Sequence, residues 1–272
     1  MKISVLMAAY GKPDHLRKAL TGYAIQNDKN YEIIVSEDGE MPENRKVIEA
    51  VASNSKVPIQ HLTQSDDGFR KSVAINSAIE AATGDYLIFS DDDCIPRKDV
   101  VSTHRQYCQQ GQYIVGAYNR LPSHITETIR TEDIISQRVF SLSWLFRNGF
   151  IPTRGFTRII APKWLGSLLD LRGPLDPGRF PGGHSSCFRN DAIEVGGFNE
   201  DMAYGLEDRE FGTRLCNLGI VGKRVKNSTF VYHLDHERPY MDMEKFEENR
   251  LILEETVRTK RIRSAHLDGS AN

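Results

Sequence analysis

Three consecutive aspartates, Asp91, Asp92 and Asp93, follow directly on an apolar run at 85–90. Adjacent carboxylates repel one another, so such a run costs stability unless a cation lies close by. Hard divalent ions such as Mg²⁺ and Mn²⁺ take oxygen ligands of this kind and also bind phosphate oxygens. The run therefore predicts a metal site for a phosphate-containing substrate. The alternative is a solvated capping turn before Pro96.

A second acidic pair, Glu207 and Asp208, precedes an apolar pattern with helical spacing at Phe211, Leu215 and Leu218. The pair is expected in the first turn of a helix, where the helix dipole favours carboxylates. Acids are ordinary at such positions, so the pair can be purely structural. The functional interpretation is that one carboxylate points into a cleft and acts as a general base toward a substrate hydroxyl.

Two histidines, His233 and His236, lie at the end of a predicted strand in which apolar side chains alternate at 230, 232 and 234. Histidine is the commonest metal ligand, but a lone histidine is more often structural. The sequence leaves open which of the two would bind a metal.

The elements that must position these side chains alternate between strand and helix patterns over the first ninety residues. Short apolar runs predict strands at 3–8, 31–36, 58–62 and 85–90. Apolar residues at helical spacing predict a first helix that Asp14 can cap, and further helices at 44–52 and 73–81. Alternation of this kind indicates a parallel α/β sheet with right-handed crossovers.

Polar clusters follow three of these strands at equivalent positions. They are Ala9–Tyr10, Glu37–Asp38 and Asp91–Asp93. Ligands bind beyond the carboxyl ends of the strands in such sheets, so a shared nucleotide cleft is predicted. Tyr10 is expected near the nucleoside base, with a core position as the alternative.

Composition limits the function classes. The 272 residues carry 35 Lys+Arg against 37 Asp+Glu, which gives no basic face for general nucleic-acid binding. No stretch approaches the roughly 18 apolar residues of a membrane span. The first residues turn polar too early for a secretory signal, and the four cysteines have neither disulfide nor zinc spacing. These patterns favour a reduced, cytoplasmic, globular protein.

Residues 134–166 stand apart because they hold basic and aromatic residues and no acid. The basic residues are Arg138, Arg147, Arg154, Arg158 and Lys163, and both tryptophans, Trp144 and Trp164, lie here. Aromatic and basic side chains suit the surface of an anionic membrane or a lipid diphosphate. The alternative is an aromatic core insertion whose arginines coat the surface.

Taken together, these motifs resemble the inverting glycosyltransferases of family 2, which have the GT-A fold, over nearly the whole length to about residue 240. The stretch 5–13 is similar to the family's nucleoside-binding loop, which implies donor contacts by Ala9 and Tyr10. The stretch 35–39 resembles the motif whose last Asp pairs with uracil, which implies that role for Asp38. Residues 68–76 resemble the segment whose basic residue reaches the diphosphate, here Arg70.

The remaining motifs extend the resemblance to the metal and acceptor sides. Residues 84–93 are similar to the strand and DxD motif, which implies Asp91 near the ribose, Asp92 beside it in the donor site and Asp93 as metal ligand. His233 falls where many GT-A enzymes place a histidine ligand. Residues 182–189 resemble an acceptor-side segment that usually reads Gly-Gly-Asn, with His184 in place of the Asn. Residues 195–208 resemble a galactosyltransferase-type C-terminal motif, which implies that Asp208, paired with Glu207, is the catalytic base.

The resemblance implies an α/β fold of GT-A type, a single domain with a Rossmann-like, mostly parallel central sheet flanked by helices. It would span 1–240, with a nucleotide-sugar half at 1–118 and an acceptor half at 119–240. Residues 241–272 are predicted as an exposed amphipathic helix at 244–263 and a frayed tail at 264–272.

The implied activity is metal-dependent, inverting transfer of a hexose with Mn²⁺ or Mg²⁺. UDP-galactose is the favoured donor, and the acceptor is a glycan or a polyprenyl-diphosphate-linked oligosaccharide of surface polysaccharide synthesis, at the inner face of the membrane. UDP-N-acetylhexosamine and dTDP-rhamnose donors stay open, as does a non-catalytic sugar-nucleotide-binding module. The loop at 10–13 lacks the Gly-rich, Arg-containing pattern of a nucleotidyltransferase and the Asp pair of an aspartyl phosphatase.

Overall fold

The computed structural model describes residues 1–152, 155–171, 175–237 and 242–268. Its centre is a seven-stranded sheet in the order β3-β2-β1-β4-β8-β6-β9, beside a three-stranded sheet in the order β5-β10-β7. The strands are β1 (Ile3–Ala9), β2 (Tyr31–Asp38), β3 (Ile59–Gln64), β4 (Tyr86–Asp91), β5 (Cys94–Pro96), β6 (Gln112–Val115), β7 (Tyr118–Arg120), β8 (Ser185–Phe188), β9 (Val221–Arg224) and β10 (Val231–His233).

The half of the large sheet that comes first in the sequence is parallel throughout. β1 pairs in parallel with both β2 and β4, and β2 pairs in parallel with β3. The carboxyl ends of these strands therefore meet at one edge, as the sequence predicted. β8 runs antiparallel to β4 and β6, so the complete sheet is mixed but mostly parallel.

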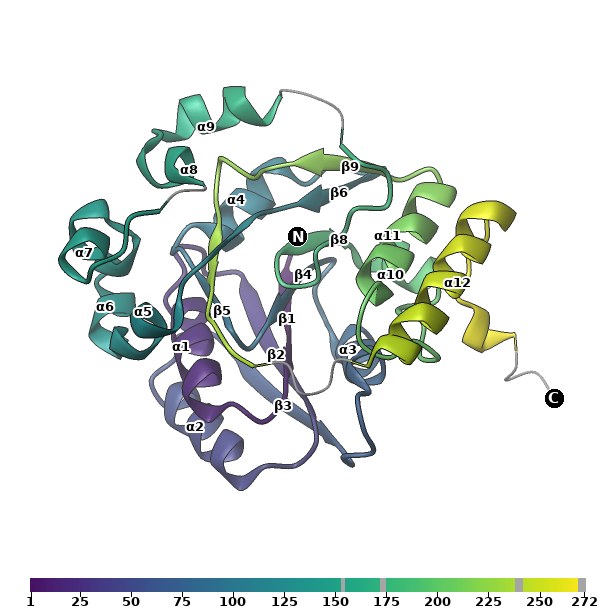
Figure 1. Cartoon of the computed structure of the whole chain (residues 1–272), viewed down its shortest axis with the longest axis horizontal. Coiled ribbons are helices and arrows are strands. Elements are labelled where there is room, and N and C mark those ends of the chain that lie inside the picture. Colours follow the sequence, from purple (N-terminus) through teal and green to yellow (C-terminus); the bar gives the residue numbers. More distant parts are fainter. Residues whose placement is uncertain (153–154, 172–174, 238–241, 269–272) are drawn as a thin grey trace.

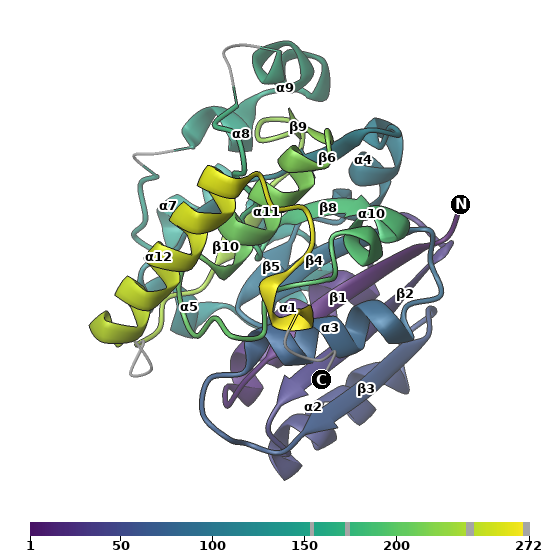
Figure 2. The same ribbon diagram turned by 90° about the vertical axis from the view of Figure 1, so that its right-hand side faces the viewer.

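Helices cover both faces of the sheet (Figures 1 and 2). One apolar cluster joins alternate β1 residues to α1, α2 and α4, and a second joins the opposite face to α3, α10 and α11. The helices of the two faces are α1 (Pro13–Ala24), α2 (Pro42–Ala52), α3 (Lys71–Ala81), α4 (Val100–Tyr107), α10 (Arg189–Glu194) and α11 (Glu207–Asn217). This alternation of buried side chains on both faces explains why β1, β2 and β4 read as continuous apolar runs.

Two local predictions need correction. Asp14 does not cap α1, because Pro13 takes the first helical position and Lys12 the capping position, which leaves Asp14 in the first turn. β2 extends to Asp38 instead of ending at Ser36, since its pairing with β3 continues to that residue.

The basic aromatic segment 134–166 has an inner part and an outer part. The inner part of the segment belongs to a third apolar cluster around the small sheet, through Ile134, Val139, Phe140 and Leu145. The outer part leaves Phe146, Phe156, Ile160 and Trp164 exposed. The interpretation as a core insertion thus applies to the inner part of the segment, and the outer part lies at the surface. Arg154 and the side chain of Lys163 lie outside the described residues.

Short helices build this region, which lies at one end of the molecule (Figure 1). They are α5 (Ser123–Thr128), α6 (Thr131–Ile135), η1 (Arg138–Phe140), α7 (Leu142–Arg147), α8 (Phe156–Ile160) and α9 (Lys163–Asp170). Among the residues described, no helix has the length and apolar character needed to cross a membrane.

The chain ends with the helix α12 (Met243–Thr259) and the short turn η2 (Ala265–Leu267). α12 lies alongside α11 in both views. The tail is docked over its described part, since Ser264 is fully buried and donates its backbone N–H to the carbonyl of Val195 at 3.0 Å. The prediction of a frayed tail is therefore wrong for 264–268, and residues 269–272 lie outside the described ranges.

Candidate active site

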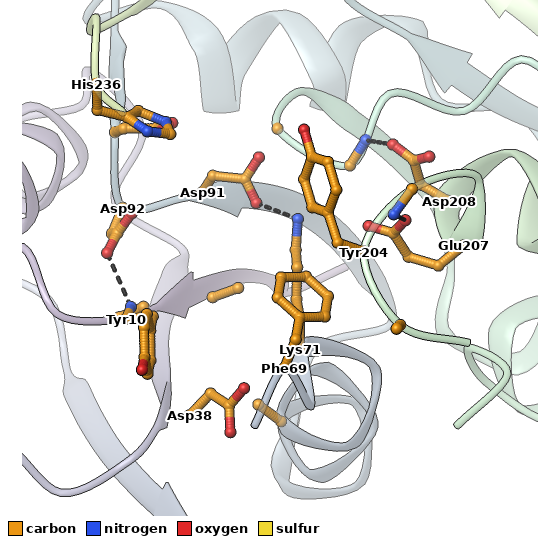
Figure 3. A pocket seen from close by; sticks show the side chains of 18 of the residues that line it. Tyr10, Asp38, Phe69, Lys71, Asp91, Asp92, Tyr204, Glu207, Asp208 and His236 are labelled. Carbon is orange, nitrogen blue, oxygen red and sulfur yellow. Dashed lines mark hydrogen bonds and ion pairs between the residues drawn. The ribbon is translucent and has the colours of Figure 1, made fainter. Parts of the chain in front are cut away.

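A pocket of about 740 Å³ lies at the carboxyl ends of β1, β2 and β4, facing the first turn of α11 and the end of β10 (Figure 3). Most of the predicted site residues line it: Ala9, Tyr10, Asp38, Asp91, Asp92, Asp93, Glu207, Asp208 and His233. The fold thus brings together side chains from positions 9 to 233. Their individual chemical roles stay predictions.

Tyr10 and Asp38 form the side of the pocket where the sequence predicts the nucleoside. Tyr10 is 46% exposed, which removes the alternative of a core tyrosine. Asp38 is buried at the end of β2, and its carboxylate accepts hydrogen bonds from the Gln64 amide at 2.7 Å and the Arg70 backbone N–H at 2.6 Å. These bonds hold the Asp38 carboxylate in a fixed orientation.

The three aspartates of the DxD run point to three different partners. Asp91 pairs with the ammonium of Lys71 at 2.6 Å, and Asp92 accepts the backbone N–H of Tyr10 at 2.9 Å. Asp93 lies 2.7 Å from Nε2 of His236. The chain itself therefore supplies most of the compensation that adjacent carboxylates require.

The three environments give the carboxyl groups different proton affinities. Burial and the neighbouring Asp93 raise the pKa of Asp92. Asp93 is also buried, but the hydrogen bond from His236 and the charges of both histidines hold its pKa well below the usual range. Of these two buried carboxyl groups, Asp93 is thus the one that stays an anion.

Asp93, His233 and His236 form a set of donor atoms that fits a metal ion. One atom from each lies within 4.8 Å of the others. Nδ1 of His233 is 2.8 Å from the carbonyl of Leu234, and Nδ1 of His236 is 2.7 Å from that of Glu237. A carbonyl only accepts, so both Nδ1 atoms carry protons, and Nε2 is the atom that can ligate, in His236 once the proton it donates to Asp93 has left.

This donor set also discriminates between metals. Two imidazoles and one carboxylate suit a transition metal better than Mg²⁺, which prefers oxygen ligands. Cys94 lies beside Asp91 and Asp93, but burial raises the pKa of its thiol, so it remains protonated. The structure places both His233 and His236 at the Asp93 carboxylate, so both stay candidate metal ligands.

Glu207 and Asp208 occupy the first turn of α11, as predicted. The Asp208 carboxylate accepts the backbone N–H of Gly182 at 2.8 Å, and the Glu207 carboxylate accepts that of Gly205 at 2.9 Å. Leu206 begins the helix with φ of 69°, a left-handed conformation that costs a non-glycine residue about 1–2 kcal/mol. The surrounding contacts hold this turn against that cost.

The electrostatics of this pair differ from those of Asp93. Burial raises the pKa of both Glu207 and Asp208, and the charge of Asp208 adds to the effect on Glu207. Lys71 lies nearby and opposes the shift in both carboxyl groups. A carboxylate with a raised pKa has greater affinity for a proton, which suits a general base.

Lys71 is the cation that sequence reasoning missed. It lines the pocket, whereas Arg70 is not among the lining residues of the described ranges. Although burial opposes its charged form, Asp91, Glu207 and Asp208 raise the pKa of Lys71 above its ordinary value. Its position in the sequence could have indicated Lys71, because it is the first residue of α3 and directly follows the loop that contacts β2.

The acceptor-side segment is only partly at the surface of the pocket. Gly182 and Gly183 line it, but His184 is fully buried, with Nε2 3.0 Å from Nε2 of His104. Burial lowers the pKa of His184 to about 4, so this histidine is neutral at physiological pH. His184 therefore packs behind the pocket wall. Its side chain does not take the place that the usual Asn has in the resembling segment.

Two family profiles match consecutive parts of the chain. Glycosyl transferase family 2 matches residues 4–166, more than half of the chain. A profile described as the N-terminal domain of galactosyltransferase matches residues 169–237. The junction of the two, at 166–169, lies within α9.

Two relatives illustrate the similarity along the chain. The uncharacterized glycosyltransferase YfnE of Bacillus subtilis is 24% identical over 87% of the chain and 65% of its own length. The hyaluronan synthase of Pasteurella multocida is 24% identical over 85% of the chain and 24% of its own length. The chain thus spans less than two thirds of either relative.

Solved structures agree on the fold. A mannosyltransferase from Pyrobaculum calidifontis, in complex with GDP-Man and Mn²⁺, has a TM-score of 0.60 at 14% identity, over 88% of this chain and 58% of that one. TarS of Staphylococcus aureus, in complex with UDP-GlcNAc, has a TM-score of 0.61 at 14% identity, over 93% and 65%. With the α/β architecture, the pocket and the family profile in agreement, the chain belongs to glycosyl transferase family 2.

Proposed function

We propose that the chain is a metal-dependent, inverting hexosyltransferase that moves a sugar from a UDP-linked donor to an acceptor hydroxyl. One observation carries the proposal: a cluster whose donor atoms could hold a metal and a pair of carboxyl groups with raised pKa values line the same pocket. Asp93, His233 and His236 form the first, and Glu207 and Asp208 form the second. Transfer from a nucleotide sugar requires both, one for the leaving diphosphate and one for the attacking hydroxyl.

The donor would enter along the carboxyl ends of the parallel strands. Tyr10 offers an exposed ring to the base, and Asp38 offers an oriented carboxylate to its polar edge. Asp93, His233 and His236 would hold Mn²⁺ or Mg²⁺, which when bound supplies positive charge to the diphosphate. Lys71, and Arg70 next to it, would add positive charge on the same side.

Asp208 would act as the base. Its carboxylate accepts the proton of the acceptor hydroxyl while that oxygen bonds to the anomeric carbon from the face opposite the diphosphate. The bond from the anomeric carbon to the diphosphate oxygen breaks, and the nucleoside diphosphate leaves with the electron pair. Attack from the opposite face inverts the anomeric configuration.

Galactose is the proposed sugar, and the match of 169–237 to a galactosyltransferase profile supports it. UDP-N-acetylhexosamines and dTDP-rhamnose are the competing donors. The structural similarity to TarS in complex with UDP-GlcNAc supports the first of these. The proposed acceptor is a glycan or a polyprenyl-diphosphate-linked oligosaccharide of surface polysaccharide synthesis.

A donor screen tests this proposal. Thermal unfolding is measured with Mn²⁺ and each nucleotide sugar, followed by assay of nucleoside diphosphate release and by mass spectrometry on lipid-linked acceptors. We expect UDP-galactose to raise the melting temperature most and to release UDP. Stabilisation without release, with every acceptor tried, would support the non-catalytic binding module, and no stabilisation by any donor would contradict both.

The proposed location is the cytoplasmic face of an anionic membrane, reached through α8 and α9. Trp164, Leu168 and Leu171 recur at helical spacing on the outer face of α9 and are 67%, 53% and 81% exposed. The segment after β9 meets this helix, since Asn227 donates its backbone N–H to Asp170 at 2.8 Å. Burial and the charges of Arg179, Arg224 and Arg158 lower the pKa of Lys226 to about 8, which shows how closely these cations gather. Apolar and cationic groups together suit an anionic lipid surface.

Vesicle co-sedimentation tests this location, with anionic phosphatidylglycerol vesicles against neutral phosphatidylcholine vesicles. Trp164→Ser should lose binding to anionic vesicles, and Leu251→Ser on α12, where Leu251 is 54% exposed, is the matched control. Absence of wild-type binding to anionic vesicles, or equal loss in both variants, would contradict docking through α9.

A further inference from the structure

The helix α12 lies outside both matched family regions, 4–166 and 169–237, yet it reaches the pocket. Asp242 and Lys245, at its start, line the same pocket as the predicted catalytic residues. The Asp242 side chain caps the helix by accepting the backbone N–H groups of Glu244 and Lys245. The N-terminal end of α12 is therefore a defined wall of the site.

Like Thr256 further along the helix, Asn249 is a polar residue of α12 that is buried. Its side chain is only 1% exposed, and its amide nitrogen donates to the carbonyls of Ala203 at 3.0 Å and Gly205 at 2.7 Å. A side-chain amide has two N–H donors, so these two bonds use both of them. Asn249 thus holds the loop at 203–206 through two of its backbone carbonyls.

This loop leads directly into the acidic pair. Gly205 has φ of 103°, and a Cβ there would lie 2.6 Å from the ring of Phe246 on α12. The N–H of Gly205 donates to Glu207 while its carbonyl accepts from Asn249. α12 therefore contacts the backbone turn that sets the direction of Glu207 and Asp208. Tyr204, which lines the pocket, lies in the same loop.

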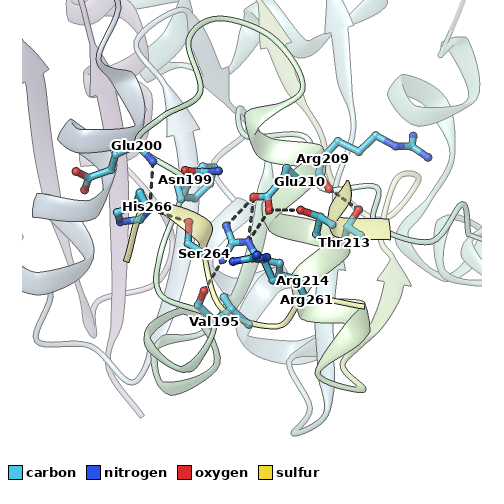
Figure 4. Close-up of polar contacts among 12 residues, drawn as sticks. Val195, Asn199, Glu200, Arg209, Glu210, Thr213, Arg214, Arg261, Ser264 and His266 are labelled. Carbon is cyan, nitrogen blue, oxygen red and sulfur yellow. Dashed lines mark hydrogen bonds and ion pairs between the residues drawn. The ribbon is translucent and has the colours of Figure 1, made fainter. Parts of the chain in front are cut away.

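The far end of α12 is tied to α11 independently. The hydroxyl of Thr256 donates to Glu210 at 3.0 Å, and Glu210 forms a fully buried ion pair with Arg214 at 2.8 Å. Figure 4 shows this pair with Ser264 and His266 of the docked tail beside it. α12 is thus held at the far end by contacts that do not involve the loop.

We propose that Asn249 is a positioning residue for the transfer reaction, and that α12 completes the acceptor side of the site. Its two hydrogen bonds fix the loop at 203–206 in its left-handed turn, and through it the orientation of Asp208 and Tyr204. This inference rests on the proposed function in that Asp208 is taken as the base. A purely structural Asn249 would contribute to stability alone.

A matched pair of variants separates the two roles. Asn249→Ala removes two bonds from an amide to backbone carbonyls near the pocket. Asn217→Ala removes two bonds of the same kind at the other end of α12, from Asn217 to the carbonyls of Thr256 and Arg261. Nucleoside diphosphate release from UDP-galactose and UDP-GlcNAc with Mn²⁺, UDP affinity and thermal unfolding are measured for both.

We expect kcat of Asn249→Ala to fall at least about tenfold, as displacement of a reacting group by about 1 Å can cost a hundredfold. Its UDP affinity should stay within about twofold of wild type. Asn217→Ala should keep kcat within about twofold despite a similar loss of melting temperature. Equal kcat in the two variants would overturn the inference while leaving the proposed function intact.

Hydrogen exchange gives a readout that needs no turnover. Asn249→Ala should accelerate exchange of the backbone amides at 203–208 by about tenfold or more, and Asn217→Ala should leave them unchanged. Unchanged exchange in both would overturn the inference even if the wild type transfers no sugar, which would separately contradict the proposed function. If Asn249→Ala fails to fold, Phe246→Leu, which loosens the contact with Gly205, is measured in its place and is expected to change exchange and kcat in the same directions.

Discussion

The pocket holds two acidic clusters that resemble each other in composition and differ in electrostatics. Asp93 is buried against two histidines, and its pKa is lowered. Glu207 and Asp208 lie near one lysine, and desolvation raises their pKa values in spite of its charge. The first arrangement favours a permanent anion that binds a cation, and the second favours a carboxylate that can take up a proton. The difference teaches that the partners of a carboxylate, more than its burial, decide its chemistry.

The sharpest way to break this comparison is Asp208→Asn. Loss of the base should reduce transfer by about 10²–10⁴-fold, because an amide cannot accept the proton. UDP affinity in Mn²⁺, measured by calorimetry, should stay within a few-fold. Asp201→Asn, at an exposed position of the same region, serves as control. Joint loss of UDP binding and transfer in Asp208→Asn would instead make Asp208 structural.

Asp93→Ala tests the other cluster. Removal of the carboxylate between His233 and His236 should reduce UDP affinity in Mn²⁺ to the value measured in excess EDTA. His233→Ala and His236→Ala should act in the same direction with smaller effects. If wild-type UDP affinity is the same with Mn²⁺ and with EDTA, the metal assignment is refuted.

Lys71→Met probes the charge that links the clusters. The base must be deprotonated to work, so activity is lost when the pH falls below its pKa. Because this pKa is raised, the loss should occur at a higher pH than the value of about 4 for an unperturbed carboxyl group. Without the lysine charge the base pKa should rise further, so the acid limb of kcat against pH should move up by about one unit. Lys71→Arg should keep the wild-type limb. An unmoved limb in Lys71→Met would show that Lys71 does not act on the base.

Tyr10→Ala should have the smallest effect. Loss of an exposed stacking surface costs about 1 kcal/mol, or roughly a fivefold weaker UDP affinity, with kcat maintained. Tyr10→Phe keeps the ring and loses only the contact of its hydroxyl with Asp66, so its affinity should be unchanged. Wild-type affinity in Tyr10→Ala would place the base elsewhere in the pocket.

Local patterns were sufficient for the strands that carry the donor side. β1, β2 and β4 are short apolar runs, and the polar residues after them had to meet because parallel strands end at one edge. The helical spacing behind Glu207 likewise placed the acidic pair in a first turn. For these residues, the spacing of apolar residues in the sequence is enough to predict the element and the end of the element at which they lie.

The features that were missed depend on contacts between distant segments. Lys71 reaches Asp91 only once α3 packs on β1 and β2, and Asn249 reaches Gly205 only once α12 lies along α11. The tail at 264–268 looked polar enough to fray, but its backbone bonds to Val195. The segment 134–166 gave one compositional signal for two environments, because composition does not say which aromatic side chains face the core.

The most direct test of the division between the clusters measures UDP affinity and sugar transfer for Asp93→Ala and Asp208→Asn side by side, with Mn²⁺ and with EDTA. The account predicts that Asp93→Ala loses the effect of Mn²⁺ on UDP affinity, whereas Asp208→Asn retains it and loses transfer alone. If both variants lose UDP binding together, or if both retain the effect of Mn²⁺, the assignment of one cluster to the metal and the other to the proton is contradicted.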